Sequence, residues 1–237
     1  MHVDGSYYEG EWDNSKANGR GVYVHVNGAR YEGYWKNDLQ HGHGVETWSD
    51  KSSFEGEYRA GKKQGRGIYK WADMSEYNGE WSDNQINGFG KYSFQDGRKF
   101  QGEWVNNNMQ GVGIYEWKDG RRYEGEYFED KKQGYGIYTW ADGRKYEGYW
   151  YKGKQHGLGR YSVPQEERER FGLWENGKRI EWFEDDMVGQ VNLGKVDVAS
   201  FFKEGGSVDS STQEQTFQRP LKFDERLKAI KKKINKF

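Results

Sequence analysis

The chain has 237 residues, of which 37 are lysine or arginine and 38 are aspartate or glutamate, giving a formal net charge of −1 that offers no whole-chain reason to expect nucleic acid. It contains no cysteine, which excludes disulfides and thiolate metal sites, whereas its 11 Trp, 18 Tyr and 12 Phe indicate a folded chain despite a mean hydropathy of −1.24. No stretch approaches the roughly 20 apolar residues of a spanning helix or the apolar core of a signal peptide, so we expect a protein that is soluble or at most peripheral to a membrane.

The sequence repeats every 23 residues from Tyr8 to about residue 163, with no residue inserted or lost. Each unit opens with a pentad such as YEGEW at Tyr8 or YEGYW at Tyr31, and the units start at residues 8, 31, 54, 77, 100, 123 and 146. We expect residues 1–7 to be the second half of an earlier unit. A fixed period of this length is typical of a repeat array in which each unit packs only against its neighbours. We therefore assign residues 1–163 to one array of about seven units.

The columns of the repeat predict two strands per unit. Counting the first aromatic residue of a unit as position 0, every unit has Tyr or Phe at position 0, Trp or Tyr at position 4, and glycine at positions 2, 11 and 13. Position 15 is tyrosine except at Glu46, and position 17 is aromatic except at His25 and Val163. Because alternate residues of a strand share a face, positions 0, 2 and 4 form one face of a first strand and positions 13, 15 and 17 one face of a second.

Turn residues separate these strands. A polar loop with glycine at its exit, NDLQHG in the unit that starts at Tyr31, is predicted between the two strands. After the second strand, four units have Asn-Gly or Asp-Gly, which supplies the positive φ of a tight turn: Asn27-Gly28, Asp96-Gly97, Asp119-Gly120 and Asp142-Gly143. The predicted fold class is therefore all-β: an elongated single-layer antiparallel β-meander of 23-residue hairpin repeats, with a short C-terminal helix.

The glycine columns need a packing explanation, because glycine weakens a strand. We expect aromatic rings of adjacent strands to lie flat over them, so that the structural glycines include Gly33, Gly42, Gly44, Gly90 and Gly113. The opposite face is expected to be polar, with ion pairs between residues two apart: Arg30 with Glu32, Arg122 with Glu124, and Lys145 with Glu147.

Position 10 is always Asn, His or Gln: Asn18, His41, Gln64, Asn87, Gln110, Gln133 and His156. These side chains could form a recognition ladder for a partner. The simpler interpretation, which we prefer, is a loop side chain that hydrogen-bonds the local backbone.

The pentad YEGxW followed by GxG within a 23-residue hairpin resembles the MORN repeat (membrane occupation and recognition nexus), over residues 8 to about 163. The resemblance implies an elongated single-sheet meander with a grooved face. It also implies a scaffold that is not an enzyme through its repeats, as in ciliary axonemes (radial spoke heads), protist cytoskeletal rings and membrane contact sites. Some members of the family accompany a lipid kinase or a methyltransferase domain.

The residues after the array depart from the pattern. Residues 164–187 contain RFGLW at Arg170 to Trp174, an echo of the pentad, and we assign them to a degenerate repeat that caps the array. Residues 188–203 form a moderately apolar extension, expected to fold back on the cap as a short strand or helix. Residues 204–219 have the composition of a linker.

Residues 220–237 are predicted to form a basic amphipathic helix that starts at Pro220. Its apolar stripe is formed by Leu227, Ile230, Ile234 and Phe237. Three roles are open for this helix: docking into a partner groove, packing on the groove of its own array, or binding an anionic membrane surface.

No catalytic, cofactor or metal site is predicted. His41 and His43 are the only close histidine pair, and no further ligand stands at a defined spacing from them. The GxG strings lack the Lys-Ser/Thr of a phosphate-binding loop and precede strands rather than helices. The segment after the array is too short for a kinase or methyltransferase domain.

The sequence therefore predicts a non-enzymatic scaffold in a large cytoskeletal assembly, with the ciliary axoneme (radial-spoke-like) as the first candidate. We expect it in the cytoplasm and cytoskeleton of a cilium or flagellum. Partner segments, from other proteins of the complex, a second MORN protein or a second copy of the chain, are expected along an aromatic groove. Its exposed rings are Trp48, Trp71, Trp117 and Trp140.

The alternative function is a peripheral membrane adaptor that binds anionic lipid through the C-terminal helix and two lysine pairs, Lys62-Lys63 and Lys131-Lys132. A targeting module within a longer enzyme is a third. The sequence names neither the partner nor the face that binds it.

Overall fold

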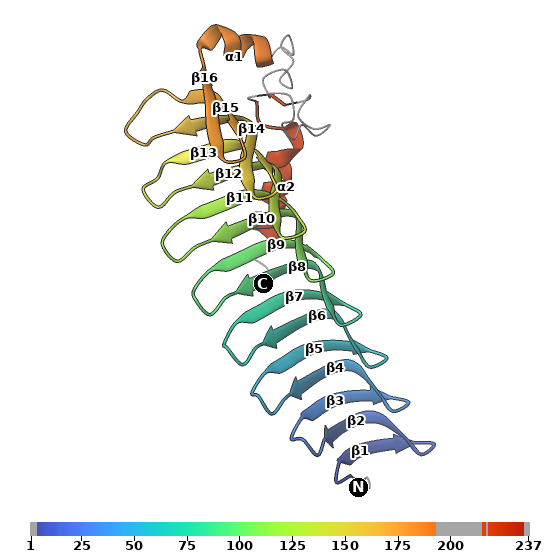
Figure 1. The fold of residues 1–237 in the computed structure, drawn as a ribbon. Coiled ribbons are helices and arrows are strands. Elements are labelled where there is room, and N and C mark those ends of the chain that lie inside the picture. The colour runs from blue at the N-terminus through green and yellow to red at the C-terminus, as the bar shows by residue number, and fades with distance from the viewer. Residues whose placement is uncertain (1–3, 193–214, 217, 235–237) are drawn as a thin grey trace. The chain divides into compact units, whose positions relative to one another are not determined.

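The structure, a computed structural model, describes residues 4–192, 215–216 and 218–234. It divides into two compact units, the first ending at Asn108 and the second starting at Met109. The described residues form sixteen strands, labelled in Figure 1, and within each unit they pair in chain order as an antiparallel meander. The first unit contains β1 (Tyr7–Asp13), β2 (Lys16–Val24), β3 (Arg30–Lys36), β4 (Leu39–Thr47), β5 (Ser53–Arg59), β6 (Lys62–Lys70), β7 (Glu76–Ser82), β8 (Gln85–Ser93) and β9 (Lys99–Val105).

The second unit contains β10 (Asn108–Glu116), β11 (Arg122–Phe128), β12 (Lys131–Thr139), β13 (Lys145–Tyr151), β14 (Lys154–Ser162), β15 (Arg170–Glu175), β16 (Lys178–Phe183) and the helices α1 (Asp185–Asn192) and α2 (Leu221–Ile234). Neither of these helices, the two in the described residues, is long and apolar enough to cross a membrane. The predicted fold class, a meander of 23-residue hairpins with a short C-terminal helix, is confirmed.

The turn inside each hairpin is tighter than the sequence predicted. Between β3 and β4 only Asn37 and Asp38 lie outside the strands, and both have positive φ, 50° and 65°. This is the geometry of a two-residue type I′ turn, which matches the twist of the flanking strands. The prediction of a six-residue loop over NDLQHG was wrong, because Leu39 already belongs to β4.

A bulge explains why the second strand looks like a loop in the sequence. Gly33 pairs with Gly44 and Trp35 pairs with Gln40, so one residue of β3 opposes three of β4. Gly42 lies in this bulge with φ of 67°, a conformation that glycine adopts at little cost. The glycine at position 11 is therefore required by the backbone and not by a covering ring.

The turn between hairpins follows the prediction. The N–H of His25 bonds the carbonyl of Ala29 at 2.8 Å, and that of Gly28 bonds the carbonyl of His25 at 2.9 Å, with Gly28 at φ 87°. This is a three-residue loop with glycine in the left-handed position. In two units a residue other than glycine takes that position: Lys51 at φ 72° and Met74 at φ 68°.

Within each unit, the other two glycine columns form a row across the strands. Gly33, Gly44, Gly56, Gly67, Gly79 and Gly90 pair successively across the strands of the first unit, and Gly113 pairs with Gly125 in the second. The ring of Tyr31 lies over this row, because a Cβ at Gly44 would lie 2.3 Å from its hydroxyl oxygen. The hydroxyl of Tyr31 donates to the carbonyl of Tyr34 at 3.0 Å. Rings over glycines, as expected from the sequence, are confirmed here.

The tryptophan at position 4 joins one repeat to the next. Trp81 packs edge-on against Phe54 and Tyr77, with centroids 5.3 and 5.4 Å away, and its Nε1–H donates to the carbonyl of Gly67 at 3.1 Å. All three rings are buried. Edge-to-face pairs of buried rings thus connect neighbouring repeats.

Position 10 also links neighbouring repeats. Its side chains accept hydrogen bonds from the backbone of the following hairpin turn: Asn37 N–H to Asn18 at 3.1 Å, Asp83 N–H to Gln64 at 3.3 Å, and Lys152 N–H to Gln133 at 3.0 Å. The expectation of a backbone bond is met. These three bonds reach the next repeat, and Asn18 also bonds its local turn as predicted, with Nδ2 donating to the carbonyls of Asp13 at 3.4 Å and Lys16 at 3.3 Å.

The face opposite the glycine row is not polar throughout, which corrects the prediction. In the second unit Val112, Ile114, Tyr135 and Leu158 on this face are buried. Leu158 belongs to a core cluster with Leu173 of β15, Phe183 of β16 and Val191 of α1. The segments 164–187 and 188–192 thus pack on the last hairpin through this face.

The predicted boundaries of the C-terminal segments remain predictions. Residues 193–203, most of the linker (204–214 and 217) and Phe237 of the apolar stripe lie outside the described residues. The side chain of Ile234 is likewise not described.

Candidate interaction surfaces

The four predicted groove tryptophans each lie at the end of a second strand, and all are half-buried. In the first unit, Trp48 stacks on Tyr69 at 5.4 Å, Tyr69 contacts Trp71 at 4.5 Å, and Trp71 contacts Tyr92 at 5.0 Å. The structure therefore brings Trp48 and Trp71 into one aromatic row.

In the second unit, Trp117 contacts Tyr138 at 5.8 Å, Tyr138 contacts Trp140 at 4.9 Å, and Trp140 contacts Tyr161 at 5.8 Å. This second aromatic row repeats the arrangement of the first. Each row presents the uncovered part of its indoles to solvent, which is suitable for an extended partner segment.

Two lysines from the predicted basic patches are half-buried among the rings. The Nζ of Lys132 lies 4.6 to 5.2 Å from the centroids of Trp117, Tyr123, Tyr138 and Trp150. Burial lowers its pKa to about 8. Lys63 lies in the same way over Trp48, Phe54, Tyr58 and Tyr69, and burial lowers its pKa although Glu46 opposes this. Lys63 and Lys132 are thus not available to a lipid surface, whereas Lys62 and Lys131 remain exposed.

The first aromatic row begins at Trp48, next to a departure from the repeat pattern. Glu46 takes the place of the position 15 tyrosine, and an open hollow of about 500 Å³ lies beside it. The hollow is lined by Tyr23, His25, Tyr31, Trp35, Gln40, Glu46 and Trp48 among others.

The C-terminal segment, described over residues 215–216 and 218–234, docks on the face of the second unit opposite the aromatic rows. Its first contact is with the backbone N–H of Leu158. In several repeats the glutamate at position 3 accepts a hydrogen bond from the N–H at position 12, as Glu126 does from Tyr135 at 3.2 Å. The unit that starts at Tyr146 has Tyr149 at position 3. There the N–H of Leu158 donates instead to Oε1 of Gln215, at 2.9 Å.

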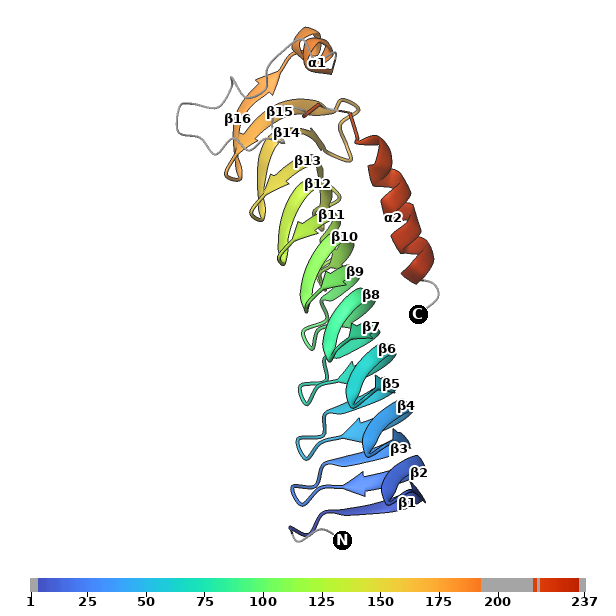
Figure 2. The same cartoon turned by 90° about the vertical axis from the view of Figure 1, so that its right-hand side faces the viewer.

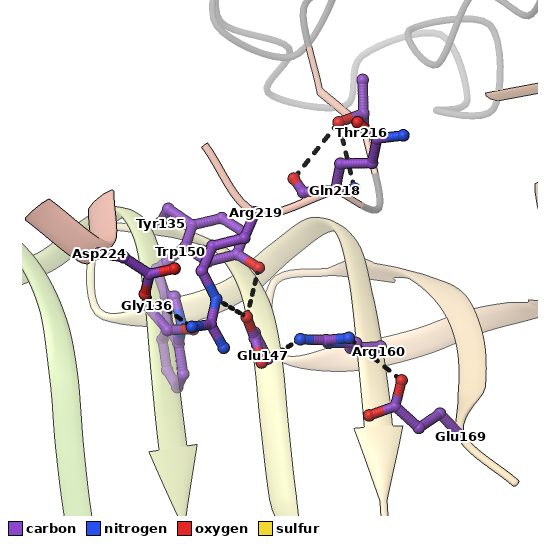
Figure 3. Close-up of polar contacts among 10 residues, drawn as sticks. All are labelled: Tyr135, Gly136, Glu147, Trp150, Arg160, Glu169, Thr216, Gln218, Arg219 and Asp224. Carbon is purple, nitrogen blue, oxygen red and sulfur yellow. Dashed lines mark hydrogen bonds and ion pairs between the residues drawn. The ribbon is translucent and has the colours of Figure 1, made fainter. Parts of the chain in front are cut away.

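A buried carboxylate holds the next residues of this segment (Figure 3). Oε1 of Glu147 accepts hydrogen bonds from the Tyr135 hydroxyl at 2.8 Å and from Nε of Arg219 at 2.6 Å, and Oε2 accepts from Arg160 at 2.7 Å. Burial opposes the ionisation of Glu147, but the hydrogen bonds from Arg219 and Arg160 outweigh it and lower its pKa. Glu147 therefore pairs with these arginines and not with Lys145, which corrects one predicted ion pair. The pairs Arg30–Glu32 and Arg122–Glu124 form at 2.6 and 3.0 Å.

Helix α2 then lies on the sheet of the second unit and runs across its strands, from β12 to β11 (Figure 2). Phe223 packs edge-on against Tyr135 at 5.0 Å, and Leu227 and Ile230 are buried. Arg226 bonds Glu126 at 2.8 Å and Lys231 bonds Glu124 at 2.7 Å, both on β11. The helix thus packs on its own chain, but against the face opposite the aromatic rows and not in the predicted groove. Docking to another protein stays a prediction.

Position 12, which is not among the aromatic and glycine columns, carries a sequence signal for this covered face. Position 12 changes along the chain from charged or polar to apolar: Arg20, His43 and Arg66 are followed by Phe89, Val112, Tyr135 and Leu158. The apolar members mark a face that requires a cover. Among the described residues, no group of three or more His, Cys, Asp or Glu residues is arranged to hold a metal ion.

The repeats match the model of a known repeat family. The model of the MORN repeat matches seven stretches of the chain, residues 8–30, 31–53, 54–73, 77–97, 100–121, 123–143 and 146–164. None of the curated proteins matches the chain.

Among solved structures, the chain is similar to the TCP domain of SAS-4 (dCPAP) of Drosophila melanogaster in complex with a proline-rich motif of Ana2 (dSTIL). That match has 11% sequence identity and a TM-score of 0.46, and covers 73% of this chain and 93% of that chain. A second match is the TCP10c domain of Drosophila melanogaster Sas-4, with 12% identity, a TM-score of 0.39, and coverage of 65% of this chain and 91% of that chain.

Proposed function

We propose that this chain, which belongs to the MORN-repeat family, is a non-enzymatic scaffold that binds segments of other proteins along its aromatic rows. The family match makes it a repeat module for binding proteins or membranes. The observation that favours protein is the half-buried state of Trp48, Trp71, Trp117 and Trp140. Rows of partly exposed aromatic rings mark interfaces, and tryptophan and tyrosine are frequent binding hot spots.

The proposal extends to the setting of the scaffold. We place it in a large cytoskeletal assembly, with the ciliary axoneme as the first candidate, and with another protein of the assembly, a second MORN protein or a second copy of the chain as partner. This part rests on the settings that a resemblance to MORN-repeat scaffolds implies. No catalytic role is proposed.

Membrane binding is the second candidate, favoured by one surface. The side of α2 that faces away from the sheet carries exposed lysines, Lys222, Lys228, Lys232 and Lys233. Flotation with liposomes with and without anionic lipid tests this candidate. Flotation that depends on anionic lipid and is lost when Lys228 and Lys232 are replaced by glutamine would support it over the scaffold.

The scaffold is tested by removing one half-buried indole from each row. The variant with Trp71→Ser and Trp117→Ser should stay folded and should capture fewer of the proteins that the wild-type chain captures from native extract. The control carries Val105→Ser and Phe128→Ser, which remove exposed apolar groups outside the rows. Proteins captured by the control but not by the tryptophan variant are those that bind through the aromatic rows. Undiminished capture by a folded tryptophan variant would refute the proposed function.

A further inference from the structure

The repeat builds a binding place for an ammonium group above its rings. Lys63 stands at position 9 of its unit, with Nζ 5.0 Å from the centroid of Trp48, 5.1 Å from Phe54, 5.9 Å from Tyr58 and 5.8 Å from Tyr69. Lys132, also at position 9, is surrounded by four rings in the second unit. Cations are attracted to aromatic faces at these distances.

The preceding unit contains the same place without its lysine. Moving back by one period of 23 residues replaces Lys63 by Gln40, and replaces its four rings by His25, Tyr31, Trp35 and Glu46. All five of these residues line the hollow of about 500 Å³ in the first unit. The hollow therefore corresponds to the position that the Lys63 ammonium group occupies one repeat later. Here the shorter, uncharged Gln40 stands at position 9, and the Glu46 carboxylate replaces one ring.

The charge of the hollow favours a cation. Both contacts that the structure gives to the Glu46 carboxylate involve Oε2, which accepts from the Tyr58 hydroxyl at 2.8 Å and lies 3.6 Å from Nζ of Lys63. Neither contact uses Oε1, and Asp38, whose Oδ1 accepts from the Ala17 N–H at 2.7 Å, adds a second carboxylate to the lining. The positively charged residue of the lining, Arg30, is already bonded to Glu32 at 2.6 Å.

We propose that this hollow binds a lysine side chain of a partner peptide, with its ammonium group between the Tyr31 and Trp35 rings and the carboxylate of Glu46. The inference rests on the proposed function, since the hollow lies beside Trp48 at the start of the first aromatic row. Lysine is preferred over arginine because the two internal occupants of this place are ammonium groups on unbranched stems. An aliphatic stem lying along Tyr23 and Trp48 would add apolar contact.

The probe is the tripeptide acetyl-Gly-Lys-Gly-amide, titrated into the full chain while the indole N–H signals of Trp35 and Trp48 are followed by NMR. We expect these signals to shift with the lysine peptide and not with the norleucine analogue, which has the same stem and no charge. Methylammonium chloride supplies the ammonium group alone. Binding of the peptide that is no tighter than that of methylammonium would overturn the assignment to a peptide side chain.

Two substitutions and a matched control test the residues. Glu46→Gln should weaken binding of the lysine peptide about tenfold, because it removes the charge and keeps the shape. Gln40→Lys should abolish binding, because it places an internal ammonium group where Lys63 and Lys132 place theirs. Glu55→Gln, an equally conservative change at an exposed carboxylate near His43, should leave binding unchanged. If Glu46→Gln lowers the melting temperature, Gln40→Lys still decides the question.

The results separate this inference from the proposed function. Unchanged peptide affinity in both Glu46→Gln and Gln40→Lys would overturn the lysine site, even if capture of native partners still depends on Trp71 and Trp117. Conversely, the folded variant with Trp71→Ser and Trp117→Ser should bind the tripeptide normally. If only that variant loses partner capture, the aromatic rows bind partners independently of the hollow.

Discussion

Gln215 completes a hydrogen bond that the last full repeat leaves open at Leu158. Its side-chain oxygen accepts from the Leu158 N–H at 2.9 Å, the place that a position 3 glutamate fills in several other repeats. Because Tyr149 stands at position 3 of this repeat, the backbone N–H would otherwise have no acceptor from its own hairpin. A single departure from the repeat pattern thus creates the docking point of a segment 57 residues further along the chain.

Gln215→Ala should loosen the C-terminal segment, because it leaves a buried N–H without an acceptor, at a cost of about 1–3 kcal/mol. Hydrogen exchange at the Leu158 amide should accelerate, and protease cleavage near α2 should increase. Gln218→Ala, at an exposed neighbouring residue, is the control and should do neither. If Tyr149→Glu restores the acceptor, Gln215→Ala should cost less in that background. An equal cost in both backgrounds would contradict this role for Gln215.

Lys132→Met should remove a pH dependence of stability. The folded-state pKa of Lys132, about 8, lies below its ordinary value of 10.5 because burial disfavours the charge. The lysine is therefore most costly to the folded state below pH 8, and stability rises as pH increases from about 8 towards 10.5. Urea unfolding at pH 7.0 and 9.5 should show a gain of up to about 2 kcal/mol in wild type relative to the variant. Lys131→Met, at the exposed neighbour, should retain the gain, and an identical profile for wild type and Lys132→Met would contradict the prediction.

The period and the ring-over-glycine packing could be predicted from the sequence because each depends on contacts within a repeat or between neighbouring repeats. Tyr31 lies over Gly44 of the adjacent strand, as the columns indicate, and also over Gly33 of its own strand. The bulge could not be predicted, because the polar letters of NDLQHG are equally typical of a loop. Only the pairing of Trp35 with Gln40 shows that three residues oppose one.

The docking of the C-terminal segment could be predicted only in part. The apolar stripe of α2 was visible in Leu227 and Ile230, but its destination depends on residues that differ between repeats, such as Tyr135 and Tyr149. Comparing only the positions that all repeats share hides these differences between repeats. The hollow beside Glu46 is of the same kind, since the sequence shows the missing tyrosine but not the place of the neighbouring Lys63 ammonium group.

Met74→Gly should stabilise the first unit. Met74 occupies the left-handed turn position with φ 68° and is 81% exposed, so its side chain contributes little packing that offsets the backbone strain. Relieving that strain is expected to raise the free energy of unfolding by up to about 1 kcal/mol, measured as a higher melting temperature. Ala72→Gly in the same turn, where φ is not positive, should be destabilising by about 0.5–1 kcal/mol. Equal effects of the two changes would show that conformation at Met74 is not the cause.

Gly90→Val should destabilise the first unit by about 3 kcal/mol. A Cβ at Gly90 would lie 2.3 Å from the hydroxyl oxygen of Tyr77, a fully buried ring whose hydroxyl bonds the Glu80 carbonyl at 3.1 Å. The added side chain must therefore displace the ring and break that hydrogen bond. Lys91→Val places the same branched residue at the adjacent position of β8 and should change the urea midpoint little, because it meets no covering ring. A loss of less than about 0.5 kcal/mol for Gly90→Val would mean that the ring over the glycine row does not hold the hairpins together.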